Sequence, residues 1–376
     1  MDEADFIVIG GGVAGASVAR ALAPRASVII LEMESQPGYH TSGRSAALYS
    51  KRYKEPSIRG LAAASGEFLH NPPPGFSETP LLSKRGLLIF GREDQRDAVD
   101  RQFTPEQIQD GVAEQVSVED ACRLIPCFNP AYLYSAMYVP AAADIDVNAL
   151  YRGFLTLAQR TGAKLICDAP VTGLSFAKGK WKTETPRGTF YAPTIINAAG
   201  AWADETAALA GLTPLGLQPL RRTCITFNPP PGVTAEPWPM AMDADEGFYF
   251  KPEAGRILAS PCDEHASPPV DAQPEELDVA HAVDRVERAT SLKINQINHR
   301  WAGLRSFMAD RRPCVGKDSR AEGFIWLAGL GGFGMMTSEA LGRLAASTAL
   351  ADAAPADIIS SGVDLERVAP DRLFKK

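Results

Sequence analysis

The feature that most constrains this chain is a glycine-rich turn at residues 10–15 (GGGVAG), which joins an apolar run to a helix-like segment. The run at residues 6–9 (FIVI) is typical of a buried strand, and the small residues at 16–23 favour a helix. In such a unit, the first glycine of G-x-G-x-x-G allows a tight turn, the second lets the backbone approach a pyrophosphate, and the third lets helix and strand pack closely. The turn therefore predicts a dinucleotide site at the helix N-terminus.

The segment after this helix strengthens the prediction, because a lone G-x-G-x-x-G can also be an ordinary loop. Residues 27–31 (SVIIL) predict a second buried parallel strand, and Glu32 lies at its carboxyl end. A carboxylate there can accept hydrogen bonds from both hydroxyls of an adenosine ribose, and it would repel a 2′-phosphate. Glu32 therefore disfavours NADP and leaves FAD and NAD open.

Length and composition exclude several classes of protein. The 376 residues exceed one ordinary core, so we expect two domains. A net charge of -7 without a basic stripe argues against nucleic acid or an anionic membrane as partner and favours a small-molecule substrate. The chain has no apolar run of about 18 residues and no basic N-terminal segment, so we expect a soluble, cytoplasmic protein without a membrane span. The scattered cysteines and histidines predict free thiols and no metal site.

Two later segments repeat the strand-turn-helix pattern. Residues 194–197 form a buried-strand run before the small-residue turn at 198–202. Residues 324–328 form another, followed by a glycine loop at 329–334 and a helix predicted at 335–353. The nucleotide-binding domain is therefore assembled from separated pieces of sequence. Simple NAD dehydrogenases seldom need this, whereas flavoproteins with an inserted substrate domain do.

Three further segments carry polar or charged residues that could lie at a binding site. Residues 41–47 (TSGRSAA) suit a loop-to-helix junction against a cofactor, although an ordinary N-capped helix would also fit. Residues 48–56, with their three cations, are predicted to form an exposed and mobile loop. In the strand predicted at 217–227, Arg221 and Arg222 point to opposite faces, and we expect Arg221 to form a surface ion pair.

Seven motifs spread along the chain are specific in combination. They are residues 8–17, 36–40, 43–47, 197–202, 215–219, 301–307 and the Gly331-Gly332 loop. In these motifs, and over almost its whole length, the chain resembles the glycine oxidase and D-amino-acid oxidase (DAO) family of FAD enzymes, and within it the D-arginine dehydrogenases of bacteria. The resemblance implies an α/β (α+β) fold of two domains. It implies a Rossmann-like FAD-binding domain assembled from residues 1–80, 142–215 and 305–376, and a substrate domain with a mixed or antiparallel sheet from residues 81–141 and 216–304.

By this resemblance FAD is bound noncovalently, with its pyrophosphate on the first glycine turn, its ribose on Glu32 and its adenine on the backbone of Val171. The last glycine loop would meet the pyrimidine edge of the flavin, where the positive helix end stabilises the charge that builds up on reduction. The residues expected at the cofactor are Gly10, Gly12, Val13, Ala14, Gly15, Glu32, Ser42, Arg44, Ser45, Ala46, Ala47, Val171, Ala199, Gly200, Trp202, Gly303, Gly331, Gly332, Gly334, Met335, Met336 and Thr337.

The reaction of this family removes a hydride from the substrate α-carbon, and water then hydrolyses the imino acid to a 2-oxo acid and ammonia. Such a site must hold the α-carboxylate firmly, and the planar guanidinium of arginine does this best. The resemblance implies that Arg222 and Arg305 bind the carboxylate. It also implies that Tyr53 and Tyr249 place hydroxyls near the substrate and that the Gly332 carbonyl accepts a hydrogen bond from the amine. Judged singly, such arginines are expected in ion pairs and such tyrosines in the core.

The expected pocket for the substrate side chain departs from the D-arginine dehydrogenases, because Leu87 and Leu48 replace a glutamate and a histidine of those enzymes. The pocket is expected to contain Leu48, Ser50, Leu87, Met242 and Met336. Burying a cation without its carboxylate is costly, so we expect neutral or apolar D-amino acids to be preferred over D-arginine. Asp243 or Glu246 would restore cation binding if either approached this pocket.

Two alternatives to D-amino-acid oxidation stay open. The same fold and carboxylate clamp serve enzymes that oxidise secondary amines such as sarcosine or proline, and a flavin-carrying subunit can be active only with a partner, as in heteromeric oxidases. A pyridine-nucleotide disulfide reductase is disfavoured, because the chain lacks a second NAD fingerprint and a redox C-x-x-C pair. The partner of the protein is expected to be a small amino-acid substrate, with either a quinone or oxygen as electron acceptor.

Overall fold

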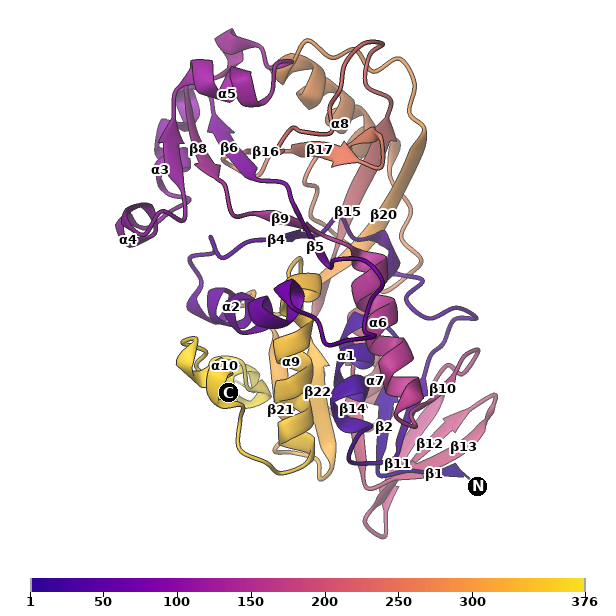
Figure 1. Cartoon of the computed structure of the whole chain (residues 1–376). Helices are drawn as coiled ribbons and strands as arrows, with labels where there is room; N and C mark the ends of the chain where they lie inside the picture. Colours follow the sequence, from indigo (N-terminus) through magenta and orange to yellow (C-terminus); the bar gives the residue numbers. More distant parts are fainter. Residues whose placement is uncertain (1, 375–376) are drawn as a thin grey trace.

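The computed structural model of the chain describes residues 2–374 and shows two bodies, one above the other in Figure 1. Among these residues the strands form four sheets, with six, nine, four and three strands. The lower body is built on a largely parallel sheet and the upper body on a mixed one, which confirms the predicted fold class. None of the helices in the described part of the chain combines the length and the apolar character needed to cross a bilayer.

The six-stranded sheet is built from pieces far apart in the sequence. Its order is β10-β3-β2-β14-β22-β21, and each strand is parallel to its neighbour except β21, which is antiparallel to β22. The strands are β10 (Lys164–Ile166), β3 (Val28–Leu31), β2 (Phe6–Ile9), β14 (Thr194–Asn197), β22 (Phe324–Ala328) and β21 (Cys314–Lys317). The three strands predicted before glycine-rich or small-residue turns, β2, β14 and β22, lie side by side at the centre of the sheet.

Both faces of this sheet are buried, as parallel sheets require. On one face Val8 and Ile30 pack in a core with three helices, and on the other Ile7 and Ile29 pack against a four-stranded sheet. The helices of the first face are α1 (Val13–Leu22), α6 (Val147–Arg160) and α9 (Gly334–Ala349), with α2 (Pro56–His70) packed on α9. The second face is covered by β1 (Asp2–Glu3), β11 (Gly173–Ala177), β12 (Lys180–Thr185), β13 (Gly188–Ala192) and α7 (Ala203–Leu209). Helix α9 ends four residues before its predicted end, because Ala351 adopts a positive φ of 56°.

The nine-stranded sheet of the upper body is antiparallel except for β16, which runs parallel to β6. In order along the sheet its strands are β19 (His265–Ala266), β15 (Gln218–Phe227), β18 (Arg256–Ser260), β17 (Tyr249–Glu253), β16 (Met240–Asp243), β6 (Leu87–Gly91), β8 (Ser135–Val139) and β7 (Glu114–Val116), while β20 (His299–Phe307) pairs with β15. Strand β20 runs through the domain boundary predicted at residue 304. The division of the chain into two domains at the predicted residues stays a prediction.

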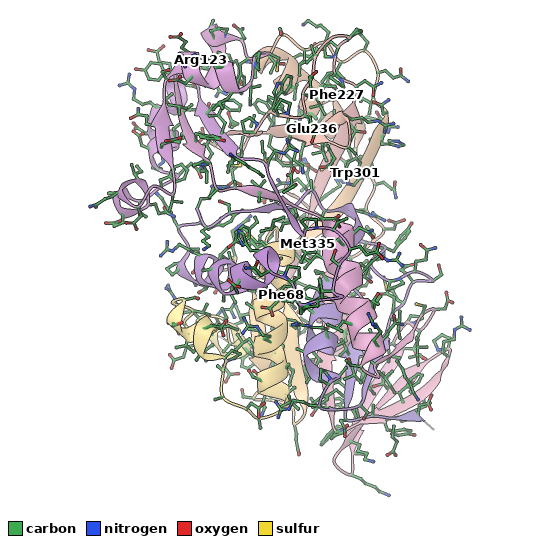
Figure 2. The ribbon with its side chains drawn as sticks, viewed as in Figure 1. Phe68, Arg123, Phe227, Glu236, Trp301 and Met335 are labelled. Carbon is green, nitrogen blue, oxygen red and sulfur yellow. The ribbon has the colours of Figure 1, made fainter. Side chains whose placement is uncertain are left out.

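The two faces of this sheet carry different side chains, because successive residues of a strand point in opposite directions. One face holds an aromatic core that includes Phe90, Phe227 and Phe250, and Figure 2 shows Phe227 inside the upper body. Helices α5 (Val118–Leu124) and α8 (Glu276–Ala289) cover this face. The opposite face carries Leu87 and Met242 among other residues, and it looks toward the lower body.

The two bodies meet at a small sheet and at the segment 48–56, whose predicted exposure is wrong. The sheet contains β4 (Leu48–Tyr49), β9 (Ala143–Ile145) and β5 (Leu82–Lys84). Residues 48–56 were expected to be an exposed loop, but β4 pairs with β9 and Arg52 is only 7% exposed. The Gln107 side chain donates a hydrogen bond to the Arg52 carbonyl at 2.8 Å, so a helix distant in sequence covers this segment. The remaining helices are α3 (Arg96–Asp100), α4 (Pro105–Gln109) and α10 (Ala356–Ser360).

The aromatic core of the upper body should dominate its stability. We expect Leu88→Ala, at a fully buried position of β6, to lower the free energy of unfolding by roughly 3–5 kcal/mol through lost burial and the cavity that remains. The matched substitution Leu277→Ala, at a leucine of α8 that is 63% exposed, should change it by less than about 0.5 kcal/mol. Urea unfolding of both variants checks this, and equal effects would contradict the assignment of Leu88 to the core.

Candidate active site

The site consists of two cavities that meet above the first glycine turn. One measures about 370 Å³ and extends to the nine-stranded sheet, and the other measures about 350 Å³ and extends to Glu32. Both are lined by Gly12, Thr41, Ser42, Ala198, Gly200 and Ala201. Together they form one elongated space across the carboxyl ends of β2 and β14, which is where open α/β sheets bind ligands.

Two positions of the turn between β2 and α1 accept no side chain larger than that of glycine. Gly10 has a φ of 104°, and a Cβ atom there would lie 2.5 Å from the Ala198 carbonyl oxygen. A Cβ atom on Gly15 would lie 1.9 Å from the Gly10 oxygen, so these two glycines serve the packing of strand and helix. Gly12 lies where the cavities join, with only the Ser42 hydroxyl near a Cβ atom, so its missing side chain keeps the junction open.

The cavity at Glu32 offers hydrogen-bond acceptors and an apolar wall. Glu32 is 7% exposed, and its carboxylate accepts hydrogen bonds from the backbone N–H groups of Gly11 at 2.7 Å and Glu34 at 2.9 Å. Burial raises the pKa of Glu32 above its usual value. Val171 and Trp202 line the same cavity, and the His40 ring packs on Trp202 while His40 Nε2 lies 2.9 Å from a Glu34 oxygen. This end has the size and polarity for an adenosine.

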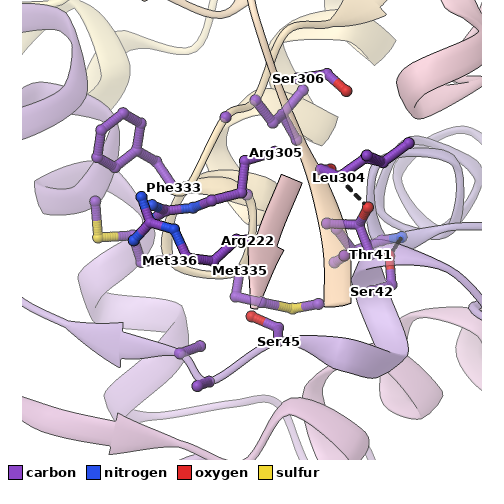
Figure 3. Close-up of a pocket in the computed structure, with 18 of the residues that line it drawn as sticks. Thr41, Ser42, Ser45, Arg222, Leu304, Arg305, Ser306, Phe333, Met335 and Met336 are labelled. Atoms are coloured by element: carbon purple, nitrogen blue, oxygen red, sulfur yellow. Dashed lines mark hydrogen bonds between the residues drawn. The ribbon is translucent and has the colours of Figure 1, made fainter. Parts of the chain in front are cut away.

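The segment at residues 41–47 lies between the two cavities and forms a short 3₁₀ turn (Thr41–Arg44) rather than an α-helix. The Ser42 hydroxyl accepts a hydrogen bond from Val13 N–H at 2.9 Å, at the start of α1. Thr41 Oγ1 donates to the Leu304 carbonyl at 2.7 Å, as Figure 3 shows. The Arg44 side chain points away and donates to the carbonyls of Ala272 and Ala302, so it holds the loop and presents only part of itself to the cavity.

The combined space fits FAD. The first turn of α1 has no acidic side chain, so the positive end of the helix dipole at Gly12 is free for a pyrophosphate. The glycine loop before α9 and the N-terminus of that helix line the larger cavity, and its first turn is also free of acidic residues. The chain would thus hold the adenosine at Glu32, the pyrophosphate at Gly12 and the flavin between residues 44–47 and α9.

Two arginines face the larger cavity from neighbouring strands. Strands β15 and β20 pair so that Arg222 lies opposite Gly303 and Leu220 opposite Arg305, which places Arg222 and Arg305 diagonally on one face of the sheet. Figure 3 shows both side chains beside Phe333 and Met336. Arg221 points to the other face and forms ion pairs with Glu275 at 2.5 Å and Asp278 at 3.2 Å, as its alternation with Arg222 predicts.

The two guanidinium groups differ in their partners. Arg222 is 9% exposed, and it donates to the Asp263 carbonyl at 2.9 Å and to Glu264 at 3.2 Å. Arg305 makes no side-chain hydrogen bond or ion pair within residues 2–374, and burial together with the charge of Arg222 lowers its pKa. A Cβ atom on Gly332 would lie 1.8 Å from Arg305 Nη2, so only glycine lets this loop approach the guanidinium. A bound anion would compensate the unpaired charge of Arg305, whereas Arg222 already pairs with Glu264.

The two tyrosines predicted at the site lie at the same cavity as the arginines. Tyr249 and Tyr53 both line the larger cavity. The Tyr249 hydroxyl lies 3.6 Å from Cys224 Sγ, and burial raises the pKa of this phenol well above its usual value, so it stays a neutral donor. The Tyr53 ring packs edge-on against Phe333, with ring centres 5.1 Å apart.

Most residues predicted at the site line one of the two cavities, and three do not. Ser50 is buried under the loop, where its hydroxyl accepts a hydrogen bond from Arg52 N–H at 3.3 Å. Thr337 donates to the Phe333 carbonyl within α9, and Gly15 packs against Gly10. The predicted residues that do line the cavities are Gly10, Gly12, Val13, Ala14, Glu32, Ser42, Arg44, Ser45, Ala46, Ala47, Leu48, Tyr53, Leu87, Val171, Ala199, Gly200, Trp202, Arg222, Met242, Tyr249, Gly303, Arg305, Gly331, Gly332, Gly334, Met335 and Met336.

Sequence reasoning missed several residues of the larger cavity. Cys224 follows Arg222 by two positions on β15 and Met240 precedes Met242 by two on β16, so strand alternation alone could have identified both. Arg52 was missed because its polar neighbours in the sequence predicted exposure. The other missed residues include Cys262, Leu304, Ser306, Phe307 and Arg311.

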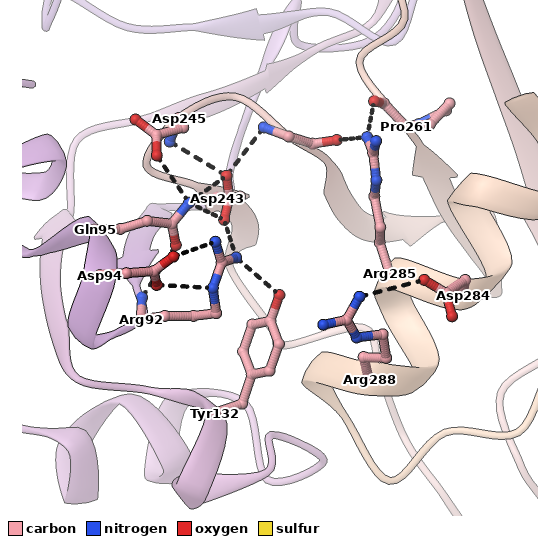
Figure 4. Close-up of polar contacts among 11 residues, drawn as sticks. Arg92, Asp94, Gln95, Tyr132, Asp243, Asp245, Pro261, Asp284, Arg285 and Arg288 are labelled. Carbon is pink, nitrogen blue, oxygen red and sulfur yellow. Dashed lines mark hydrogen bonds and ion pairs between the residues drawn. The ribbon is translucent and has the colours of Figure 1, made fainter.

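Asp243, considered as a partner for a cationic substrate, points away from the cavity. Its carboxylate accepts hydrogen bonds from the Gln95 side chain at 3.0 and 3.2 Å and from the backbone N–H of Gly247 at 3.0 Å, and Arg92 lies 3.6 Å away (Figure 4). This carboxylate is 2% exposed and does not line the cavity. Glu246 does line it, from an exposed position on the following turn.

The cavities together are large enough for a dinucleotide, and they lie between a parallel α/β body and a mixed sheet. This combination is typical of a two-domain, nucleotide-dependent enzyme. A profile of the DAO family, described as FAD dependent oxidoreductase, matches residues 5–348. The chain therefore belongs to the DAO family of FAD dependent oxidoreductases, and FAD is its cofactor.

Individual relatives agree with this assignment. Mitochondrial dimethylglycine dehydrogenase of Mus musculus is 25% identical over 393 residues, which cover 95% of this chain and 44% of that protein, so this chain spans less than half of that relative. Glycine oxidase of Geobacillus kaustophilus is 24% identical over 91% of this chain and 92% of that protein, and its crystal structure matches with a TM-score of 0.83 over 97% of this chain and 99% of that one. The crystal structure of L-proline dehydrogenase from P. horikoshii matches with a TM-score of 0.82 at 20% identity, over 97% and 98% of the two chains.

Replacing Gly12 by leucine should abolish FAD binding, because the new side chain would fill the junction of the two cavities. Its Cβ atom would lie 3.2 Å from the Ser42 hydroxyl, so the fold needs only a small shift of that side chain to accept it. The flavin absorbance of the purified protein measures this, and circular dichroism checks that the variant is folded. Ala177→Leu, which adds similar bulk at an exposed position of β11, should keep its flavin. If Gly12→Leu retained full flavin content, the position assigned to the pyrophosphate would be wrong.

Proposed function

We propose that the protein catalyses the oxidative deamination of D-amino acids to a 2-oxo acid and ammonia, with neutral or apolar side chains preferred over that of D-arginine. The observation that supports this most directly is the pair of guanidinium groups of Arg222 and Arg305 at the cavity, which suits an α-carboxylate beside the flavin end. Bound FAD supplies the acceptor for the hydride that leaves the substrate α-carbon.

The roles of the remaining site residues follow from this arrangement. Arg222 and Arg305 would neutralise the carboxylate and fix its plane, and the Gly332 carbonyl would accept a hydrogen bond from the amine. Holding both groups leaves the α-carbon with one orientation toward the flavin, which lowers the entropic part of the barrier. Tyr249, neutral because of its burial, would donate a hydrogen bond to the carboxylate, and Tyr53 would lie beside the substrate.

The side-chain preference rests on the wall of the cavity next to the arginines. Leu48, Leu87, Met240 and Met242 form an apolar surface there, and methionine side chains adapt to different shapes. With Asp243 engaged elsewhere, this wall gives a cationic side chain no buried carboxylate, so arginine and lysine would bind poorly. The preference for the D configuration rests on the sequence motifs, because an L-proline dehydrogenase shares the fold.

A second candidate function is the oxidation of secondary or tertiary amino acids. The similarity to a dimethylglycine dehydrogenase favours it, and the same two arginines would hold the carboxylate of such a substrate. A third is a flavin-carrying chain that needs a partner for turnover. Activity of the purified single chain would exclude the third candidate.

We expect D-leucine, D-methionine and D-phenylalanine to reduce the bound flavin under anaerobic conditions, and their L-enantiomers to leave it oxidised. Sarcosine, dimethylglycine and L-proline should reduce it more slowly. The loss of flavin absorbance after mixing measures each rate, and readmitting oxygen or a quinone then identifies the electron acceptor. Faster reduction by the N-methylated substrates or by L-proline would replace the leading proposal with the second candidate.

We expect Arg222→Leu and Arg305→Leu each to lower kcat/KM by roughly 10- to 100-fold, because a charge-assisted contact to the substrate carboxylate is lost. Arg221→Leu is the matched control, since its side chain lies on the opposite face of β15 in ion pairs, and it should keep the kcat/KM of the unaltered protein. Flavin content should stay near normal in all three variants. A variant at Arg222 or Arg305 with unchanged kcat/KM would exclude that arginine from the clamp.

A further inference from the structure

Arg52 introduces a buried positive charge into the otherwise apolar wall. It lines the larger cavity with Leu48, Leu87 and Met242, and it is 7% exposed. Its guanidinium lies over the Tyr53 ring, with 4.8 Å between the guanidinium carbon and the ring centre. The adjacent Lys51 is exposed and does not line the cavity, so the two cations of this loop have different environments.

The contacts of Arg52 leave its charge uncompensated. Nη1 donates to the Gln102 side-chain oxygen at 3.0 Å, and Nη2 lies 3.6 Å from Met242 Sδ. Both partners are neutral, and a thioether is a weak acceptor, so most of the five N–H groups of the guanidinium have no strong partner. Within residues 2–374 no carboxylate forms an ion pair with Arg52.

Two other cations with buried side chains, Arg85 and Lys251, are paired with carboxylates, whereas Arg52, like Arg305, is not. The Arg85 side chain, 8% exposed, forms ion pairs with Asp144 at 2.6 Å and Glu236 at 3.2 Å. The Lys251 side chain, 4% exposed, pairs with Asp144 at 2.8 Å and Glu253 at 2.7 Å. Burying a charge without a partner costs several kcal/mol, so an unpaired guanidinium that faces a cavity favours an anionic ligand there.

Two acids at the end of β16 and in the turn after it, Asp243 and Glu246, do not supply that anion. Asp243 is 2% exposed and already accepts hydrogen bonds from Gln95 and from the backbone of its own turn. Glu246 lines the cavity but is exposed to solvent and forms no ion pair with Arg52 in the part of the chain described.

We propose that Arg52 binds a carboxylate on the side chain of the substrate, so that the pocket prefers acidic D-amino acids such as D-glutamate over their amides. The proposal rests on the proposed function, because it takes Arg222 and Arg305 as the clamp for the α-carboxylate. Leu48, Leu87 and Met242 would pack against the methylene groups between the two carboxylates. The pocket therefore combines an apolar wall with a charged end.

The test compares D-glutamate with D-glutamine, which have nearly the same shape and differ in charge, on the FAD-bound enzyme. We expect kcat/KM to be about tenfold or more higher for D-glutamate, since it gains a charge-assisted contact in a buried site. Arg52→Met should bring the ratio to one or below, mainly through KM. Lys51→Met removes the same charge from the adjacent exposed position and should leave the ratio unchanged. D-leucine serves as the neutral reference substrate.

A binding measurement separates this inference from the proposed function. Glutarate and pentanoate have the same carbon chain, and their binding is followed by the change in flavin absorbance without turnover. We expect glutarate to bind about tenfold more tightly, with the difference lost in Arg52→Met and kept in Lys51→Met.

Each outcome decides one of the two proposals. If D-leucine is oxidised but D-glutamate has no advantage over D-glutamine, and Arg52→Met leaves this ratio unchanged, the inference is wrong and the proposed function stands. If no D-amino acid reduces the flavin, the proposed function fails, and the glutarate titration alone decides the role of Arg52. Equal binding of glutarate and pentanoate would then overturn it.

Discussion

The arrangement of this protein depends on two positive charges that are held close together away from bulk water. Arg222 and Arg305 lie diagonally across the β15–β20 pair, and burial and mutual repulsion disfavour the charged state of Arg305. The two arginines stay together despite this repulsion because their strands are held by backbone pairing, which is continuous from Gln218–Phe307 to Thr226–His299. The N-terminus of α9, without acidic residues in its first turn, adds positive potential at the same place. A site with these properties favours an anion, whether a carboxylate or a reduced flavin.

The position of this clamp relative to the dinucleotide cavity is fixed by contacts between the two bodies. Thr41 donates a hydrogen bond to the Leu304 carbonyl, Arg44 donates to the Ala302 carbonyl, and the Trp301 indole donates to the Arg44 carbonyl at 3.0 Å. The loop that lies against the cofactor space is thus bound to the strand that carries Arg305. Hydride transfer depends strongly on distance and orientation, so such direct contacts between loop and strand suit the reaction.

The sequence predicted those parts of the fold that depend on local patterns. The strand-turn-helix units around Gly10 and Gly331 could be predicted because each needs only an apolar run, a glycine loop and a helix in direct succession. The opposite directions of Arg221 and Arg222 followed from the period of a strand. The burial of Arg52 could not be predicted this way, because it depends on β4 pairing with β9 and on Gln107, which are distant in sequence. A segment of polar residues predicts exposure only when no other segment covers it.

The difference between side chains fixed by strand register and side chains placed by a loop also bears on substrate specificity. The apolar wall of the pocket comes from the nine-stranded sheet, where register fixes which side chains face the cavity: Leu87 lies beside Met240, and Met242 beside Tyr249. The charge at its end comes instead from Arg52, whose guanidinium contacts Gln102 and Met242. We therefore expect that a charge can be added, removed or reversed at position 52 or 87 without disturbing the end of the cavity at Glu32, because neither residue lines that part. In the proposed arrangement, the selection of the side chain is thus physically separate from the binding of the α-carboxylate and the cofactor.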